Sequence, residues 1–249
     1  MLHKNIIVLI ATFFVVTSSM AQEGESKWEF DMSGGVKVGG AAPLSIPKEI
    51  RDIQSYGLGG LPLFIKINTE YKVNPTWGIR TGLVLEGKGM YAKAGVKGYK
   101  TTFNGADDPS QNVRGYYYGD ITTKVDNIYL TVPLQVTYQL SNRWDLQFGP
   151  YLSYALSRRF YGEAIEGYMR SETPTGEKVG VSNVAYNFDS SIRKYDVGAS
   201  LGARYGFGSG FHVLGQFDYG FNSIMNTGFE SISFGLHNIY MNIGVGFRL

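Results

Sequence analysis

Histidine often carries acid–base chemistry, and the chain contains three, at positions 3, 212 and 237. His237 follows Ser233 by four residues, and Glu230 precedes both. A Ser-His-acid set of this kind could serve a lipid- or peptide-modifying enzyme. Such a set is recognised by geometry rather than by closeness in sequence, and His212 falls at the opposite end of the strand pattern described below. We therefore expect His237 to be an ordinary strand-end residue, with the enzyme kept as an alternative.

A second cluster offers the oxygen ligands that calcium prefers. Asp107 and Asp108 lie between Asn104 and Asn112. The cluster lacks the ordered spacing of a known calcium loop, so we expect a solvated turn. The chain has no cysteine, which excludes a thiolate metal site and a thiol nucleophile. The sequence thus indicates no catalytic, cofactor-binding or metal-binding residue.

A third cluster is suited to binding rather than to catalysis. Arg114, Tyr116, Tyr117 and Tyr118 stand almost together. Aromatic and arginine side chains are favoured in binding patches, so this segment could form a stacking surface for a glycan or a peptide. The alternative is an extended strand whose tyrosines pack on one another.

The composition restricts the class of protein that carries these residues. Charged residues make up 18% of the chain, aromatic residues 14%, and the formal net charge is +2. A charge this small and this evenly spread argues against a nucleic-acid partner. The 33 glycines and 18 tyrosines suit a β-rich protein with tight turns and aromatic belts.

The N-terminus has the three parts of a secretory signal peptide. A short basic start is followed by an apolar run over residues 5–16 and by small residues at Ser19 and Ala21. The run is short for a spanning helix, which needs about 20 residues. We expect residues 1–21 to be a cleaved signal peptide and residues 22–249 to form one outer-membrane β-barrel domain.

The rest of the chain alternates between apolar and polar residues with a period of two, which is typical of strands with one apolar face. The clearest strand sets Leu130, Val132 and Leu134 on one parity against Thr131 and Gln135 on the other. The pattern predicts eight strands, over residues 27–39, 60–73, 76–91, 124–140, 143–158, 192–207, 210–225 and 233–249.

The connections between these strands alternate in length. Tight turns are expected at residues 73–76, 141–143 and 208–210. Long polar stretches occupy residues 40–59, 92–123 and 159–191, with a shorter one at 226–232. This asymmetry is typical of outer-membrane barrels. We therefore predict an all-β fold: an eight-stranded antiparallel up-and-down transmembrane β-barrel with short periplasmic turns and long extracellular loops.

Alternation alone does not decide which face meets lipid, because a soluble lipocalin-like barrel alternates with its apolar face inside. The tryptophans favour the membrane. Trp28, Trp77 and Trp144 each open an outgoing strand on the apolar parity, as a periplasmic aromatic girdle requires. The expected girdle comprises Trp28, Tyr71, Trp77, Tyr138, Trp144, Phe207, Phe211 and Phe247.

The polar parity carries as many acidic as basic residues, so full pairing inside a barrel is possible. We expect an interior charge network of Asp31, Lys66, Glu70, Arg80, Glu86, Lys88, Asp145, Asp196, Arg204, Asp218 and Arg248, with Glu29, Lys37 and Lys194 on the same parity. Charges taken out of water need partners, and eight strands leave just enough width for side chains to fill. A plugged interior is therefore predicted rather than an open channel.

Three prolines fall inside predicted strands, at Pro62, Pro133 and Pro150. Each removes a donor from the strand ladder. We expect them to mark bulges or strand ends.

Short motifs on these strands resemble the PorT-type outer-membrane β-barrel family of Gram-negative bacteria. Residues 129–134 (YLTVPL) are similar to the family's recurring Tyr-Leu-x-x-Pro-Leu strand, and residues 149–152 (GPYL) to its Gly-x-Tyr/Phe pattern. The closing segment 242–247 (NIGVGF) also fits, although Leu249 replaces the aromatic end residue of many barrels. The family's namesake is implicated in type IX secretion, so the resemblance implies an outer-membrane location and a link to protein secretion.

These features predict a non-catalytic structural anchor that contacts other molecules through its extracellular loops. A small pore is the alternative, and an enzyme that uses His237 is a third hypothesis. The expected partners are outer-membrane lipid, the barrel assembly machinery and a protein or glycan at the loops, with no cofactor and no nucleic acid.

Overall fold

A computed structural model of the chain describes residues 27–104, 112–229, 231, 232 and 234–249. The predicted signal peptide, residues 1–21, lies outside the described residues. Within the part that the structure describes, no helix is long and apolar enough to cross a bilayer.

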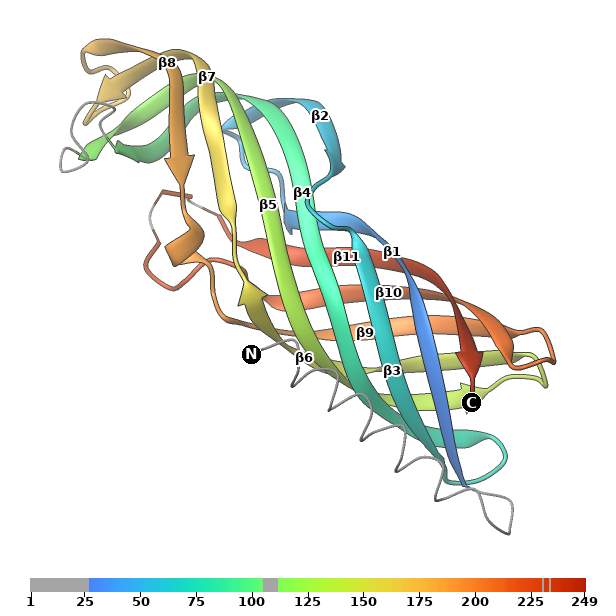
Figure 1. Cartoon of the computed structure of the whole chain (residues 1–249). Coiled ribbons are helices and arrows are strands. Elements are labelled where there is room, and N and C mark those ends of the chain that lie inside the picture. The colour runs from blue at the N-terminus through green and yellow to red at the C-terminus, as the bar shows by residue number, and fades with distance from the viewer. Residues whose placement is uncertain (1–26, 105–111, 230, 233) are drawn as a thin grey trace, which may run out of the picture.

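Eight antiparallel strands close into a ring. They are β1 (Trp28–Pro43), β3 (Leu63–Lys72), β4 (Trp77–Asn104), β5 (Asn112–Gln139), β6 (Trp144–Ser157), β9 (Tyr195–Gly206), β10 (Phe211–Ser223) and β11 (Leu236–Arg248). Their order around the ring is β4-β3-β1-β11-β10-β9-β6-β5, and the pairing of β4 with β5 closes it. Each ring strand pairs with the next one along the chain, and β1 pairs with β11. The predicted eight-stranded up-and-down barrel is therefore confirmed (Figure 1).

The period-two pattern places apolar side chains outside the ring and polar ones inside. On β5, Leu134 is 56% exposed whereas its neighbour Gln135 is 3% exposed. The same division holds on β9, where Leu201 is 62% exposed and Ser200 is 4% exposed. An apolar outer face with a polar interior is the reverse of a lipocalin-like barrel, so that alternative is excluded.

Tight turns join the ring strands at one end, where the residue types fit the backbone. In the turn after β3, the side-chain carbonyl of Asn74 accepts hydrogen bonds from the backbone N–H groups of Thr76 and Trp77, both at 2.9 Å. In the turn after β9, Gly208 and Gly210 have φ values of +80° and +86°, which favour glycine. These turns set the register in which successive strands pair.

At the other end the long connections contain more strand than expected. The tyrosine segment lies in an extended strand, which was the alternative given for it, whereas the separate strands within residues 40–59 and 159–191 were not expected. The strands β4 and β5 continue as one hairpin to Asn104 and from Asn112. Three further strands flank this hairpin: β2 (Ile50–Leu58), β7 (Phe160–Ser171) and β8 (Lys178–Asn187), the last followed by a 3-10 turn at Asp189–Ser191. They pair in the order β2-β4-β5-β7-β8 to form what we call the outer sheet (Figure 1). Buried tyrosine, valine and methionine side chains supply the core that a solvated loop would lack.

The prolines disturb the strands less than expected. Pro62 immediately precedes β3, so it lies at a strand end as predicted. The β5–β6 ladder pairs Pro133 with Tyr151 and resumes at Val136 with Phe148, in unchanged register. Pro133 and Pro150 thus fall in or beside one interruption, and neither marks a bulge in that ladder.

The height of the lipid-facing surface matches a bilayer. On β6, Trp144 and Tyr154 face outward near the two ends and are 44% and 41% exposed. Ten residues of strand span about 33 Å, which at the usual tilt corresponds to an apolar band about 25 Å tall.

If this surface meets lipid, the same substitution has different effects at two valines of similar exposure. Val132, near the middle of the band, is 45% exposed, and Val179, on the outer sheet, is 53% exposed. Val132→Arg is expected to lower the free energy of unfolding in lipid vesicles by about 2–4 kcal/mol, and Val179→Arg to change it by less than about 0.5 kcal/mol. Urea titrations of both variants measure this difference. Equal effects at the two sites would contradict the assignment of the bilayer face.

Candidate functional site

The barrel interior holds a balanced set of buried charges. Five acids and five bases are at most 6% exposed. They are Asp31, Glu70, Glu86, Asp196 and Asp218 with Lys37, Lys66, Arg80, Lys88 and Arg204. An isolated buried charge is costly, so the equal numbers are a condition for filling this space with ions.

At the periplasmic end, two arginines bridge acids from several strands. The Arg80 guanidinium on β4 contacts Asp31 of β1 and lies 3.2 Å from Glu70 of β3. Arg204 on β9 lies 2.8 Å from Asp145 of β6 and 3.4 Å from Glu70. These ion pairs tie five strands together across the lumen.

In the middle of the lumen, Lys37 joins three strands. Its ammonium group lies 2.5 Å from Glu86 on β4 and 3.1 Å from Asp218 on β10. Lys66 donates to Gln216 at 2.9 Å, and Gln216 in turn donates to Asp218 at 2.6 Å. The neutral amide of Gln216 therefore connects Lys66 to this cluster of ion pairs.

Toward the outer end, Lys88 on β4 is the central cation. It lies 2.8 Å from Asp196 on β9 and 3.3 Å from Glu86. Its ammonium group also faces the rings of Tyr129 and Tyr151, at 4.9 and 4.8 Å from their centroids. Paired acids and bases therefore occupy the lumen from its periplasmic end to its outer third.

The network leaves little free space. The interior cavity among Lys66, Arg80, Glu86, Arg204 and neighbouring side chains has a volume of about 20 Å³, roughly the room needed for a single water molecule. A lumen filled in this way is a packed core that holds the wall of the barrel in shape.

The structure places the predicted network residues with few differences. Ten of the eleven face the lumen, with Asp145 less deeply buried than the rest. The eleventh, Arg248, has a 41% exposed side chain at the periplasmic rim, where it contacts Glu29 and Asp145. Lys194 was expected on the interior parity but is exposed, because it precedes the first residue of β9. His212 faces the lumen near the periplasmic end, 4.0 Å from Asp31.

The aromatic residues at the periplasmic end form cross-strand pairs. Ring centroids lie 4.8–5.0 Å apart in each pair. The pairs are Trp28–Tyr71, Trp77–Tyr138, Trp144–Tyr205 and Phe211–Phe247. Sequence reasoning missed Tyr205 and chose Phe207, which lies on the same parity and instead contacts Tyr205 edge-on at 5.2 Å. Strand register, which the sequence alone did not provide, would have identified the partner of Trp144.

The tyrosine cluster of the outer sheet divides between two faces. Tyr117 is fully buried and donates hydrogen bonds to the carbonyl oxygens of Asp120 and Glu166. Tyr118 lies on the opposite face and stacks on Tyr168, with centroids 4.9 Å apart and planes at 7°. The three tyrosines therefore cannot form a single stacking surface, because consecutive strand residues point to opposite sides. Arg114 lies on β5 opposite Thr102.

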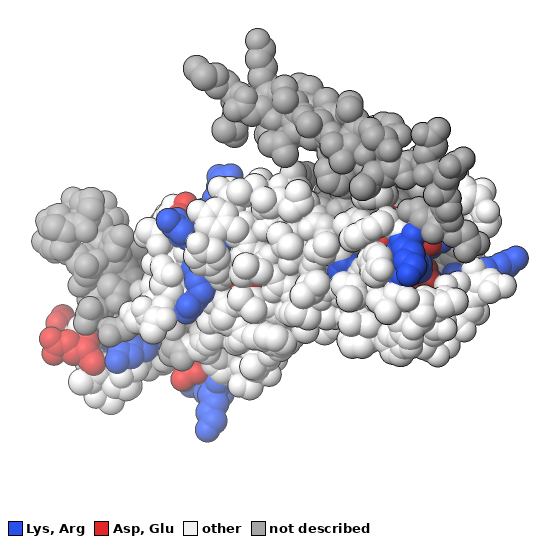
Figure 2. All heavy atoms as spheres, turned by 90° about the horizontal axis from the view of Figure 1, so that it is seen from below, with Lys and Arg blue, Asp and Glu red and all other residues white. Residues whose placement is uncertain are grey.

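Basic side chains lie on the same outward face of the outer sheet as Tyr116 and Tyr118. Arg170 and Lys178 approach the ring of Tyr168, at 5.8 and 4.7 Å from its centroid. On β4, Lys97 pairs with Tyr118 and Lys100 with Tyr116. We call this set the outer patch: Lys97, Lys100, Tyr116, Tyr118, Tyr168, Arg170 and Lys178. Figure 2 shows charged side chains gathered toward the two ends of the molecule, with a largely uncharged surface between them.

Most of the remaining candidate residues fall outside the part of the chain that the structure describes. The ring of His237 lies outside the lumen, stacked on Tyr219, with Nδ1 2.9 Å from the carbonyl oxygen of Gly220. Ser233 and Glu230 lie outside the described residues, as do Asp107 and Asp108 of the calcium candidate. Among the residues that are described, no group of three or more His, Cys, Asp or Glu side chains could hold a metal ion.

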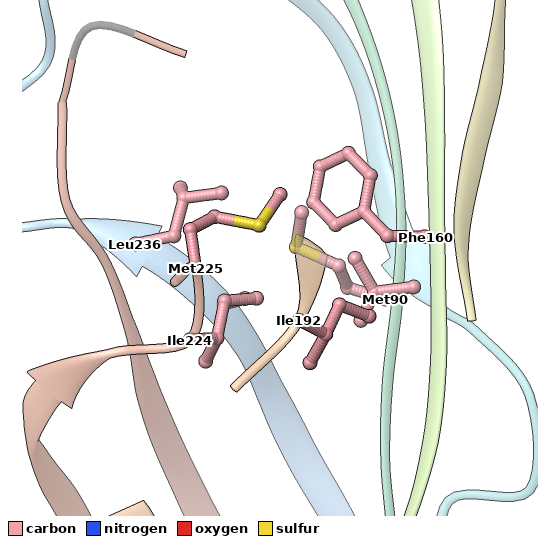
Figure 3. Close-up of a cluster of buried hydrophobic side chains, with 8 residues drawn as sticks. Met90, Phe160, Ile192, Ile224, Met225 and Leu236 are labelled. Carbon is pink, nitrogen blue, oxygen red and sulfur yellow. The ribbon is translucent and has the colours of Figure 1, made fainter. Parts of the chain in front are cut away.

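An apolar layer that sequence reasoning did not identify covers the outer end of the lumen. We call it the apolar cap, and it consists of Ala41, Met90, Val125, Phe160, Ile192, Ile224, Met225 and Leu236. Figure 3 shows side chains of the cap, contributed by β4, β7, the start of β11 and the connections before β9 and β11, pointing toward one another. Above the cap lies a cavity of about 300 Å³ between the barrel mouth and the outer sheet, which we call the outer cavity.

The interior network predicts that replacing a buried lysine lowers the free energy of unfolding much more than replacing an exposed one. Lys88→Met leaves Asp196 without its cation and is expected to lower the free energy of unfolding by about 3–5 kcal/mol. Adding Asp196→Asn should recover part of this loss, because no unpaired carboxylate then remains. Lys194→Met, at an exposed site, should change stability by less than about 0.5 kcal/mol. Urea titrations in vesicles give all three values, and a Lys88→Met effect as small as that of Lys194→Met would contradict the network.

Comparison with solved structures gives remote similarities. The chain is similar to Ail, the attachment invasion locus protein of Yersinia pestis, whose crystal structure was solved in complex with the heparin analogue sucrose octasulfate. The identity is 12%, the TM-score is 0.38, and the match covers 91% of this chain and 100% of that one. It is similar to Neisserial surface protein A, with 12% identity, a TM-score of 0.34, and coverage of 91% and 99%. The toluene transporter TbuX of Ralstonia pickettii matches at 7% identity, a TM-score of 0.21, and 90% coverage of each chain.

No curated protein matches the chain. A family model described as "Outer membrane protein beta-barrel domain" matches residues 20–226, which is most of the sequence. The match covers seven of the eight ring strands completely, together with the whole outer sheet. The chain therefore belongs to the outer membrane protein beta-barrel domain family.

Proposed function

We propose that the protein is a non-catalytic anchor in the outer membrane that presents the outer sheet to a glycan or protein partner. The observation that carries this proposal is the continuity of β4 and β5. Both strands run from the packed barrel into the outer sheet without a break, so the sheet is held by the charge network below it. Binding sites on such rigid elements lose little conformational freedom when they are occupied.

The packed lumen supports an anchor rather than a pore, because a cavity of about 20 Å³ gives ions no continuous path. It also favours a non-catalytic role, since the buried acids are paired with cations instead of facing a substrate-sized space. The described contacts of His237, with Tyr219 and the carbonyl oxygen of Gly220, give the enzyme hypothesis no further support.

The outer patch supports a glycan as the partner, preferably one with negative charge. Tyr118 and Tyr168 offer stacked aromatic surface, and four basic side chains surround it. Aromatic and arginine side chains are the ones most often found at energetically important binding positions. Glu172 and Glu177 lie at the edge of the patch, in the β7–β8 connection, where they would oppose an anionic ligand.

Further parts of the proposal concern the family subgroup and the route to the membrane. The motifs at residues 129–134 and 149–152 support a PorT-type subgroup and, through it, a link to protein secretion. The pattern of residues 1–21 supports export by a cleaved signal peptide, with residues 22–249 as the mature barrel domain. Insertion of such a barrel implies the barrel assembly machinery as a transient partner, and the periplasmic aromatic pairs support contact with lipid headgroups.

Binding to heparin, used as a probe for an anionic glycan, tests the proposal. Arg170→Gln with Lys178→Gln should weaken retention of the protein, held in nanodiscs, on immobilised heparin. The matched control, Lys48→Gln with Lys194→Gln, removes two charges from other exposed positions and should have less effect. Glu172→Gln with Glu177→Gln should strengthen retention. If the control variant lost as much retention on heparin as the outer-patch variant, a binding role of the outer patch would be contradicted.

A further inference from the structure

The outer cavity lies on the side of the outer sheet opposite to the outer patch. Its volume of about 300 Å³ is at the lower end of the range for small-molecule sites. Small side chains create the space, since Ala92 and Ala94 of β4 and Ala41 of β1 all line it. The apolar cap forms its floor through Met90, Phe160 and Leu236 (Figure 3).

The walls are apolar and uncharged. Among the described residues that line the cavity, none is Asp, Glu, Lys, Arg or His. The polar groups that do line it are largely occupied. The Tyr186 hydroxyl donates to the carbonyl oxygen of Thr122 at 2.6 Å and lies 2.7 Å from Thr123 Oγ1, and the Tyr117 hydroxyl donates to two carbonyl oxygens.

Burial also keeps these hydroxyls neutral. It raises the pKa of Tyr117 to about 12, and it raises the pKa of Tyr99 and Tyr186 as well. The described lining of the cavity therefore offers no charge to a ligand over the ordinary pH range, and burying a charged ligand against it would be costly.

Exposed apolar residues follow one another along the chain from the cavity to the lipid-facing strand β3. Ile46, Ile53 and Tyr56 line the cavity yet are more than half exposed, at 63%, 51% and 53%. From there, exposed Leu58 and Leu61 lead along the chain to β3. The apolar strip then joins the lipid-facing side chains of β3, Leu63 and Ile65, which are 45% and 58% exposed.

We propose that the outer cavity binds a neutral hydrocarbon group, which enters from the outer leaflet past Ile53 and Tyr56. The enclosed apolar walls select for hydrocarbon, the absence of charged lining residues among those described selects against ionised ligands, and the apolar strip gives access from the membrane. This site goes beyond the proposed glycan-binding function and is independent of it, because it uses the opposite face of the outer sheet.

Photolabelling tests the site with a fatty alcohol that carries a diazirine, added to the protein in nanodiscs. Illumination should attach the probe to the cavity residues Met90, Tyr99 and Phe160, as well as to the lipid-facing side chains that serve as an internal reference. Ala94→Phe fills the cavity and should abolish labelling of its walls while leaving the reference labelling unchanged. Ala203→Phe adds the same bulk outside the cavity, on the outward parity of β9, and should preserve both.

Folding of each variant is checked by its heat-dependent shift on a gel, and Ala92→Leu replaces Ala94→Phe if the latter does not fold. A phospholipid with the diazirine on its acyl chain identifies the source of the ligand: labelling of the cavity by this lipid indicates an acyl chain, and labelling by the alcohol alone indicates a free molecule. Cavity residues that remain unlabelled by both probes, or remain labelled in a folded cavity-filled variant, would overturn the proposal.

Discussion

The pairing of buried charges inside the ring is the interaction on which the structure depends. The strands present apolar side chains to lipid, so their polar side chains must all turn inward, into a space too narrow for bulk water. There, five acids and five bases must neutralise one another, because each would be costly alone. Lys37, Arg80 and Arg204 each contact acids from at least two other strands. Lys88 contacts Asp196 of β9 and Glu86 of its own strand. The network therefore closes the interior and fixes the shape of the wall at the same time.

A barrel fixed in this way can support structure beyond the membrane. The hairpin of β4 and β5 extends out of the ring, and β2, β7 and β8 add to its two edges. The resulting outer sheet has two different faces. One carries stacked tyrosines and cations, and the other encloses the apolar cavity above the cap. Both proposed sites follow from this arrangement, since each includes side chains of β4 and β5, whose backbone is continuous with the barrel.

Much of this could be predicted from the sequence, and what could not has a physical reason. Alternation with a period of two identified all eight ring strands and the side that most of their residues face, as at Leu134 and Gln135, whereas Lys194 was misplaced because it precedes β9. The partner of Trp144 was missed because register is set by pairing between strands. Strands β2, β7 and β8 were not predicted because each depends on the edge of another strand, β4, β5 or β7, which exists only after folding. The apolar cap was missed for a similar reason: Met90, Phe160, Ile192 and Leu236 are far apart in the chain and share no local pattern.

Single-channel conductance of the refolded protein in a planar bilayer tests the central claim most directly, once a heat-dependent gel shift has shown that the barrel is folded. The paired charges and the small interior cavity predict a silent membrane, with no steps at any applied voltage. Steady ohmic steps from the folded protein would show that water and ions pass through the lumen, and this would contradict a barrel closed by its own charges.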